Sequence, residues 1–186
     1  MKRYVVWIVS LFILAGCDHS SKELDAGMQL RSSILQSSGC TFTTEITADY
    51  GDRICQFTVI NQMNDDGNLS FTLENPTTIA GISGRMTGEG GQIIFDEQAL
   101  YFPLMADELL SPISAPWIMI KALRSGYLTS ACIENGETRL SVDDTYGDDD
   151  LRLDIWLNNE NNPTHVDILH DGRRILTMNV RKFEIS

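Results

Sequence analysis

The sequence lacks a long apolar run, and this absence excludes a membrane-spanning helix of ordinary length. Its longest run, from Val5 to Ala15, holds eleven residues and includes one serine, whereas a bilayer requires roughly 20 apolar residues. Lys2 and Arg3 give the run a positively charged start. A charged start, a short apolar middle and small residues at the end are typical of a secretory signal peptide.

The junction of this signal peptide with the mature chain reads Leu14-Ala15-Gly16-Cys17, which resembles the lipobox of bacterial lipoproteins. In that motif the cysteine sulfur receives a diacylglycerol, and the peptide bond before the cysteine is then cut. The alternative is an ordinary cleaved signal with an incidental cysteine, but the agreement of four positions favours the lipobox. Two acyl chains anchor a protein almost permanently, whereas one holds only marginally.

A lipid on Cys17 predicts a location at the outer face of the bacterial plasma membrane. In bacteria with two membranes, an aspartate after the lipidated cysteine, here Asp18, resembles the signal for retention in the inner membrane. Bacteria with one membrane offer no other destination. We therefore expect a signal peptide over 1–16, a lipidated tether over 17–21 and one folded domain over 22–186.

Basic residues are scarce, with 14 Lys and Arg against 26 Asp and Glu. Two of the basic residues leave with the signal peptide, so the mature chain has 12 of them and a formal charge of −14. This acidity excludes nucleic acid and anionic membrane surfaces as partners that bind through charge. A basic protein, a metal or an uncharged ligand remains compatible with it.

Motifs for catalysis and metal binding are absent from the sequence. Of the three histidines, His19 lies in the tether, while His165 and His170 are five residues apart in one expected strand, which places them on opposite faces. No His-Glu-x-x-His occurs, and "GISGR" around Ser83 is not the Gly-x-Ser-x-Gly turn of hydrolases. We expect a protein that is not an enzyme and that has no cofactor and no metal site.

Cysteine is also scarce. Beyond Cys17, the chain has Cys40, Cys55 and Cys132, an odd number that allows at most one internal disulfide. An oxidising compartment would permit that disulfide. Buried thiols that pack as small apolar groups are the simpler expectation.

The mature chain opens with a predicted helix, which begins at a capping box formed by Ser20 and Glu23 and ends near Gly39. Its apolar positions at helical spacing are Leu24, Met28, Ile34 and Leu35. From Cys40 to about Phe102 the apolar period changes to two, which predicts strands.

A second helix interrupts these strands, because Ser114 and Pro116 are suited to start a helix and Gly126 to end it. Strands resume afterwards, and Asp171-Gly172 between two apolar runs predicts a hairpin. We predict an α+β fold that is mainly β: about eleven strands in one large, curved antiparallel sheet, with both helices against its concave face.

The order of elements and four stretches resemble the LolA-like superfamily of lipoprotein-localisation and lipid-binding proteins, and more narrowly its clostridial germination lipoproteins. The stretches are "ADYGDRICQFTV" (48–59), "ENPTTIAGISGRM" (74–86), "LSPISAPWIMIKALRSGYL" (110–128) and "HDGRRI" (170–175). The resemblance implies an unclosed β-barrel whose mouth is covered by helices.

The resemblance also implies two functions. The narrower one is a binding or accessory protein that assists a cell-wall amidase acting on spore peptidoglycan in germination. The broader one is a carrier or acceptor of acyl chains or lipoproteins, although a permanent anchor argues against free shuttling. The resemblance identifies no catalytic residue.

An apolar set is expected where the middle helix meets the concave sheet. Its members are Phe57, Phe71, Phe95, Trp117, Met119, Ile120, Leu123, Tyr127 and Trp156. Either these side chains fill a closed core, or they line a cavity for an acyl chain, since ligand sites are concave and mostly apolar.

An acidic run, "VDDTYGDDD", is the strongest polar candidate. Its carboxylates belong to Asp143, Asp144, Asp148, Asp149 and Asp150. The run lacks the spacing and the distal glutamate of a calcium loop. It is interpreted as a solvated turn between two strands, or as a docking surface for a basic partner.

Overall fold

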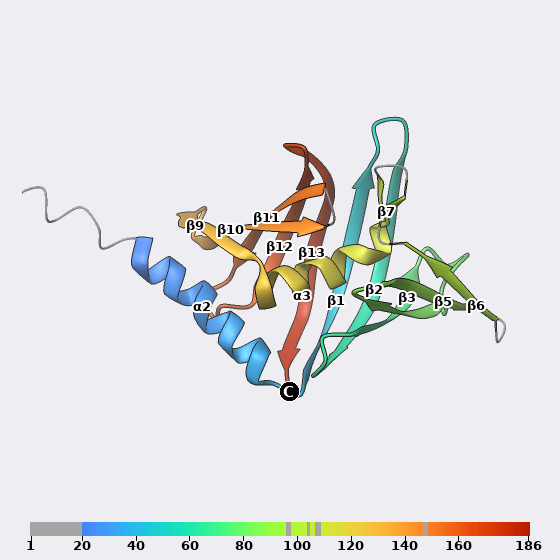
Figure 1. Cartoon of the computed structure of the whole chain (residues 1–186), viewed down its shortest axis with the longest axis horizontal. Helices are drawn as coiled ribbons and strands as arrows, with labels where there is room; N and C mark the ends of the chain where they lie inside the picture. Colours follow the sequence, from blue (N-terminus) through green and yellow to red (C-terminus); the bar gives the residue numbers. More distant parts are fainter. Residues whose placement is uncertain (1–19, 96–97, 104, 107–108, 147–148) are drawn as a thin grey trace, which may run out of the picture.

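The computed structural model describes residues 20–95, 98–103, 105–106, 109–146 and 149–186. Eleven strands form one antiparallel sheet in the order β6-β5-β4-β3-β2-β1-β13-β12-β11-β10-β9. The end strands β6 and β9 do not pair with each other in the described chain, so the sheet is an unclosed barrel (Figure 1). The predicted fold class is confirmed.

The sheet consists of two meanders. The first contains β1 (Gly39–Asp49), β2 (Ile54–Asn64), β3 (Leu69–Asn75), β4 (Ser83–Thr87), β5 (Gly90–Phe95) and β6 (Gln98–Phe102). The second contains β9 (Tyr127–Glu134), β10 (Glu137–Tyr146), β11 (Asp149–Leu157), β12 (Pro163–His170) and β13 (Arg173–Ile185). The first and last strands, β1 and β13, pair along most of their length and join the two meanders.

The segment between the meanders carries the middle helix. It contains the short pair β7 (Met105–Ala106) and β8 (Leu109–Leu110), the 3-10 turn η2 (Pro112–Ser114) and the helix α3 (Ala115–Ser125). The predicted cap, Ser114, lies inside the 3-10 turn, and its hydroxyl donates to the Ser111 carbonyl, not to an amide of α3. The helix ends as predicted, where the Gly126 amide donates to the Ala122 carbonyl.

The first helix, α2 (Ser20–Gln36), packs against β9, β10 and α3. Of its four predicted apolar positions, only Ile34 is buried. The buried positions are Glu23, Gly27, Leu30 and Ile34, whereas Leu24, Met28 and Leu35 are 39%, 49% and 51% exposed. Gly27 lies at the centre of the contact, where an added Cβ would stand 3.0 Å from the Leu140 side chain. The close approach of α2 to the sheet at this glycine sets the rotation of the helix.

The three cysteines outside the signal region are all free thiols. Cys40 is buried, and this burial raises its pKa to about 12 despite the nearby Arg124. Cys55 is half-buried and packs against the core, whereas Cys132 is exposed on β9. The expectation of buried thiols therefore fits Cys40 and fails for Cys132, which is on an edge strand.

Among the described helices, none has the length and apolar character needed to cross a bilayer.

Candidate functional site

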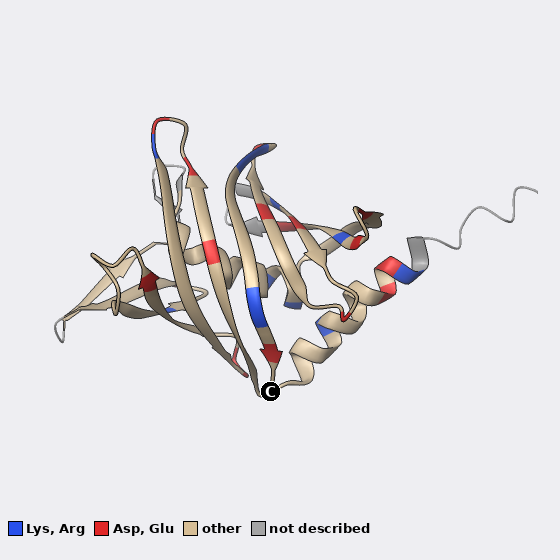
Figure 2. Ribbon diagram, turned by 180° about the vertical axis from the view of Figure 1, so that it is seen from behind, with Lys and Arg blue, Asp and Glu red and all other residues tan. Residues whose placement is uncertain are grey.

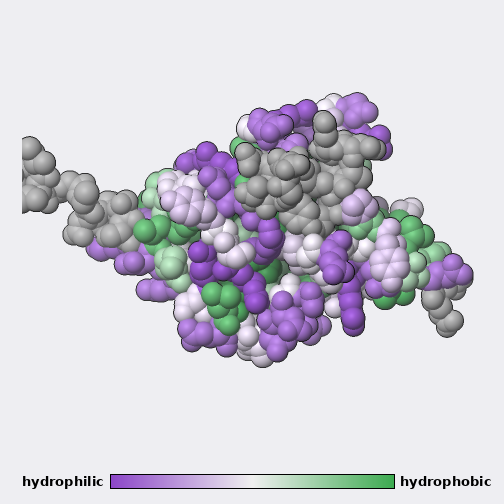
Figure 3. All heavy atoms as spheres, in the orientation of Figure 1, coloured by the Kyte–Doolittle hydropathy of each residue, from purple (hydrophilic) through white to green (hydrophobic). Residues whose placement is uncertain are grey.

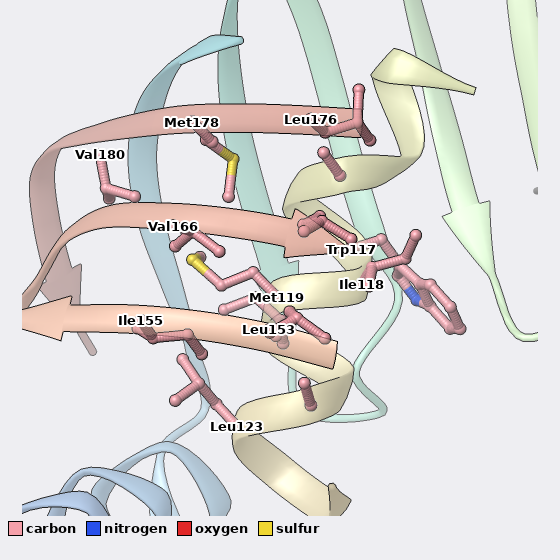
Figure 4. Packing of buried hydrophobic residues seen from close by; sticks show 14 of the residues in the cluster. Trp117, Ile118, Met119, Leu123, Leu153, Ile155, Val166, Leu176, Met178 and Val180 are labelled. Atoms are coloured by element: carbon pink, nitrogen blue, oxygen red, sulfur yellow. The ribbon is translucent and has the colours of Figure 1, made fainter. Parts of the chain in front are cut away.

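The centre of the concave face is a filled core. Trp117, Ile118, Met119, Ile120 and Leu123 of α3 are at most 5% exposed. Figure 4 shows α3 side chains pointing toward apolar side chains of β11, β12 and β13. The sheet contributes Leu153, Ile155, Val166, Ile168, Leu176 and Met178, each 0% exposed. The α3 members of the expected apolar set therefore belong to a closed core.

Six of the nine expected apolar residues belong to this core or pack against it. Phe71 and the four α3 residues Trp117, Met119, Ile120 and Leu123 are buried, and Phe57 is half-buried against the cluster. The other three, Phe95, Tyr127 and Trp156, lie elsewhere. Phe95 is at the end of β5 and Tyr127 at the start of edge strand β9, and they are 66% and 75% exposed.

Trp156 faces away from α3. It stands between Ile155 and Leu157, which are both buried on the concave face, and neighbouring residues of a strand point to opposite sides. Its Nε1 donates to Glu134 Oε2 at 3.1 Å, and its ring meets His165 edge to face at 5.0 Å. The nine residues consequently do not converge on one cavity.

An apolar pocket remains open at the β5–β6 end of the sheet, with a volume of about 490 Å³. It is lined by Tyr50, Asp52, Arg53, Ile93, Leu100, Phe102, Pro103, Leu110, Ser111 and Ile113. We call it the open-end pocket. In Figure 3 hydrophobic atoms gather at this end of the molecule (right). Leu100 is 70% exposed, so the apolar lining continues to the surface.

Two glycines shape the sheet beside the open-end pocket. Phe71 pairs with Gly84 and Phe102 pairs with Gly91, and each ring lies over its glycine. An aromatic ring over a glycine fills the space that the missing side chain leaves in a sheet. Phe102 contributes to the pocket wall, and Ile93 and Leu100, which are cross-strand partners, extend the apolar surface.

Tyr50 fixes the opposite wall of the pocket. Its hydroxyl donates to the Leu110 carbonyl at 2.5 Å, which ties the β1–β2 turn to the segment before α3. Burial raises the pKa of Tyr50 to about 12; Cys55 adds to this rise and Arg53 opposes it. The hydroxyl therefore keeps its proton, and the hydrogen bond, throughout the neutral range.

The sequence alone does not predict this pocket, although signals for it are present. "ALYFPL" (99–104) and "LSPIS" (110–114) are apolar stretches beside a proline. The first stretch has the pattern of a strand and the second that of a helix start. Neither pattern indicates that the two stretches lie side by side. Only the pairing of β5 with β6 and the Tyr50–Leu110 hydrogen bond show that they share a pocket with the β1–β2 turn.

The acidic run divides between the two faces of the sheet. Asp143 is exposed. Asp144 forms an ion pair with Lys121, whose Nζ is 2.8 Å from Asp144 Oδ1, and the Asp144 side chain is only 9% exposed. Asp149 and Asp150 start β11, and their side chains, like all of Asp148, lie outside the described residues. The described part of the run therefore offers one free carboxylate, not a continuous docking surface.

The two histidines of β12 lie on opposite faces. His165 is paired with Trp156 on the outer face, and His170 is paired with the buried Leu151. His165 contacts Asn179 Oδ1 at 2.9 Å and Asp167 Oδ1 at 3.3 Å. In the described chain no group of three His, Cys, Asp or Glu side chains is placed to hold a metal ion.

No protein-family model and no curated protein matches the chain. It is similar in fold to several solved structures. A conserved protein from Thermus thermophilus shares 11% identity, with 89% of this chain and 86% of that one covered and a TM-score of 0.47. A LolA superfamily protein from Nitrosomonas europaea shares 8% identity, with 91% of this chain and 94% of that one covered and a TM-score of 0.45.

A lipoprotein from Mycobacterium tuberculosis is also similar, at 9% identity with 87% and 93% of the two chains covered and a TM-score of 0.40. Identities and TM-scores this low give no information about function, so the function of this chain is argued from its own residues.

Proposed function

We propose that this chain is a non-enzymatic binding protein outside the cytoplasm, held at the outer face of the plasma membrane by a lipid on Cys17, and that it takes an acyl chain in the open-end pocket. The observation that supports this function is a contrast within one sheet. The concave face under α3 is packed, whereas the apolar lining at β5 and β6 stays open.

The pocket has the size and lining of a small-molecule site. Its volume of about 490 Å³ is within the usual range of roughly 300–1,000 Å³. Ile93, Phe102 and Ile113 are half-buried, and Leu100 is exposed at the entrance. Each methylene that enters such a site is stabilised by about 0.8 kcal/mol.

The polar groups of the pocket favour an uncharged chain over a charged ligand. Asp52 and Arg53 are exposed at the rim and carry opposite charges, so the rim has no net charge. The Tyr50 hydroxyl is already occupied by the Leu110 carbonyl. A ligand that requires many hydrogen bonds would leave its polar groups unpaired there, whereas an acyl chain requires none.

Displacement of a fluorescent fatty acid tests this function. Leu100→Glu places a charge at the pocket entrance, and we expect it to weaken binding at least about tenfold because burying an unpaired charge is costly. Ile133→Glu is the matched control, since Ile133 is 55% exposed on β9 at the other edge of the sheet. Equal binding by both variants would refute the assignment.

We infer a second candidate function, contact with a cell-wall amidase during spore germination. It is supported by the position of three stretches that carry the resemblance to the germination lipoproteins. The stretches 48–59 and 110–128 meet at the Tyr50–Leu110 hydrogen bond. The third, 170–175, joins them because Arg173 Nη2 stands 3.2 Å from the point where a Cβ of Gly51 would be.

Pull-down of an amidase from sporulating cells tests this second function. Arg173 is exposed at this meeting point, so Arg173→Glu is expected to abolish capture by reversing the charge there. Lys182→Glu reverses an exposed charge at the far end of the same strand and should capture as the unmodified protein does. If neither the unmodified protein nor the control captures an amidase, this result counts against the amidase function.

A further inference from the structure

The outer face of the first meander, which points away from α3, carries a groove that the proposed function does not use. Two hollows of about 520 and 570 Å³ lie beside each other on strands β1 to β6. They share Arg85 and Thr87, so they form one continuous groove across the strands.

A continuous row of cross-strand partners follows this groove. Gln62 pairs with Ser70, Ser70 with Arg85, Arg85 with Gln92, and Gln92 with Tyr101. Cross-strand partners project from the same face of a sheet, so these five side chains form one row over five strands. We call this row the outer ladder.

The outer ladder differs in charge from the rest of the outer face. On the second meander and β1 the outer face carries ion pairs, among them Arg174–Asp167 and Arg181–Glu45. Figure 2 shows this contrast, because few charged segments mark β2 to β6 while several mark β11 to β13. In a chain with 26 acidic residues, the ladder holds one charge, that of Arg85.

The ladder has unused hydrogen-bonding capacity. Within the described part of the chain, the side chains of Gln62, Ser70 and Arg85 make no hydrogen bond and no ion pair with the protein, and each is exposed. Gln92 Nε2 is 3.4 Å from the Tyr101 hydroxyl, and Tyr101 is 77% exposed. The row thus presents amide, hydroxyl and guanidinium groups that end at an open aromatic ring.

We propose that the outer ladder binds an extended, β-linked oligosaccharide. Amides and a guanidinium offer paired donors and acceptors that match the neighbouring hydroxyls of a sugar ring, and an aromatic ring stacks on the apolar face of a sugar. Neighbouring strands are about 4.8 Å apart, close to the length of one pyranose unit. A β-linked glycan is nearly straight, so successive units can follow successive rungs.

Other ligand classes fit the ladder less well. A protein partner needs a fully buried apolar centre in its interface, and the five ladder side chains provide none except the Tyr101 ring. Nucleic acid needs many cations for its phosphates, and the ladder has one. The hydroxyl-rich surface of a neutral glycan matches it without an unpaired charge.

Titration of the intact protein with chitotetraose, cellotetraose and maltotetraose tests the proposal. We expect heat of binding for at least one of the two β-linked tetramers, and shifts of the Gln62 and Gln92 side-chain amide signals in NMR spectra. The α-linked maltotetraose is curved and should bind at least about tenfold more weakly, since it cannot follow the row and loses hydrogen bonds to it.

Two variants locate the site. Arg85→Ala and Tyr101→Ala should each weaken binding about tenfold, whereas Tyr127→Ala should not, because Tyr127 is an equally exposed tyrosine on the opposite edge strand, 75% against 77%. Unchanged binding by both ladder variants would overturn the proposal. No binding of either β-linked tetramer, with no shift of the two amide signals, would also overturn it, and this result needs no variant to fold.

Discussion

Gly84 lies where the sheet has no space for a side chain. An added Cβ would stand 2.2 Å from the Gln92 carbonyl oxygen and 2.5 Å from Phe71 Cζ. Both the backbone of β5 and a core ring would have to move, and Phe71 is only 2% exposed. The ring over the glycine therefore joins the packed centre of the concave face to the β4–β5 part of the sheet.

We predict that Gly84→Ala lowers the free energy of unfolding by about 1–3 kcal/mol, the usual range for overpacking a filled site. Gly88→Ala is the control, because an added Cβ there meets no atom within 4 Å. Urea unfolding of both variants measures the difference. Equal stability of the two would show that Phe71 does not occupy the space over Gly84.

His165 makes stability dependent on pH. The hydrogen bond to Asp167 raises the pKa of His165, burial opposes this rise, and Asn179 adds to it. A raised pKa in the folded state stabilises the protein fully below the unfolded value of about 6.5, and this stabilisation is lost as pH rises through the folded value. The pair is partly exposed, so its contribution is small.

We predict that His165→Gln costs more stability at pH 5.5 than at pH 8, by about 0.5 kcal/mol. Unfolding curves of the variant and of the unmodified protein at both pH values give the difference. A larger cost at pH 8 would contradict the assigned direction of the shift.

The burial of an apolar side chain depends more on its place in a strand and in the sheet than on its residue type. The alternation of Leu151, Leu153, Ile155 and Leu157 is visible in the sequence, and it already places Trp156 on the other face. Phe95 is exposed because it is the last residue of β5. The position of Tyr127 follows from which strands are at the edges of the sheet. That depends on the pairing of β1 with β13, which no local pattern reveals.

At the scale of elements, Arg31 joins the two helices. Its Nε donates to the Leu123 carbonyl at 2.7 Å, and its Nη2 donates to the carbonyls of Gly126 at 2.7 Å and Ala122 at 3.3 Å. The last carbonyls of a helix have no partner within the helix and carry partial negative charge. One guanidinium from α2 therefore completes the C-terminal end of α3.

We predict that Arg31→Ala lowers the free energy of unfolding by about 1–2 kcal/mol, the scale of hydrogen bonds to a charged group. It should also speed amide exchange in α2. Gln29→Ala, on the exposed side of the same helix, is the control and should change neither quantity. If Arg31→Ala leaves the amide exchange of α2 unchanged, the contact with β9 and β10 alone holds the helix.

The number and order of the main elements were predictable because periods of two and of helical spacing alternate clearly along the chain. The rotation of α2 was not, since it depends on a close approach at Gly27 to Leu140 of a distant strand. The short β7–β8 pair and the η2 turn were also missed, because segments of two or three residues show no period.

At the scale of the whole molecule, the half-barrel has a packed region and an open one. α2 packs against β9 and β10, α3 lies across the middle of the sheet, and the apolar surface of β5 and β6 extends beyond them (Figures 1 and 3). The proposed acyl site and the proposed glycan site lie on opposite faces of the first meander. Under these two proposals, an acyl chain and a glycan bind to the same strands from opposite sides.

Detergent-phase partitioning tests the anchor. We predict that the full-length protein enters the detergent phase and that Cys17→Ser remains in the aqueous phase, because two acyl chains provide an effectively permanent anchor. If both forms stay in the aqueous phase, Cys17 carries no lipid.

The most direct test of acyl binding is photo-crosslinking with a diazirine fatty acid followed by mass spectrometry of the peptides. Binding in the open-end pocket predicts labels on lining residues such as Ile93, Leu100, Phe102 and Ile113, and their loss in Leu100→Glu but not in Ile133→Glu. Labels confined to α3 and to β11, β12 and β13 would contradict it, because they would require the packed centre of the concave face to open.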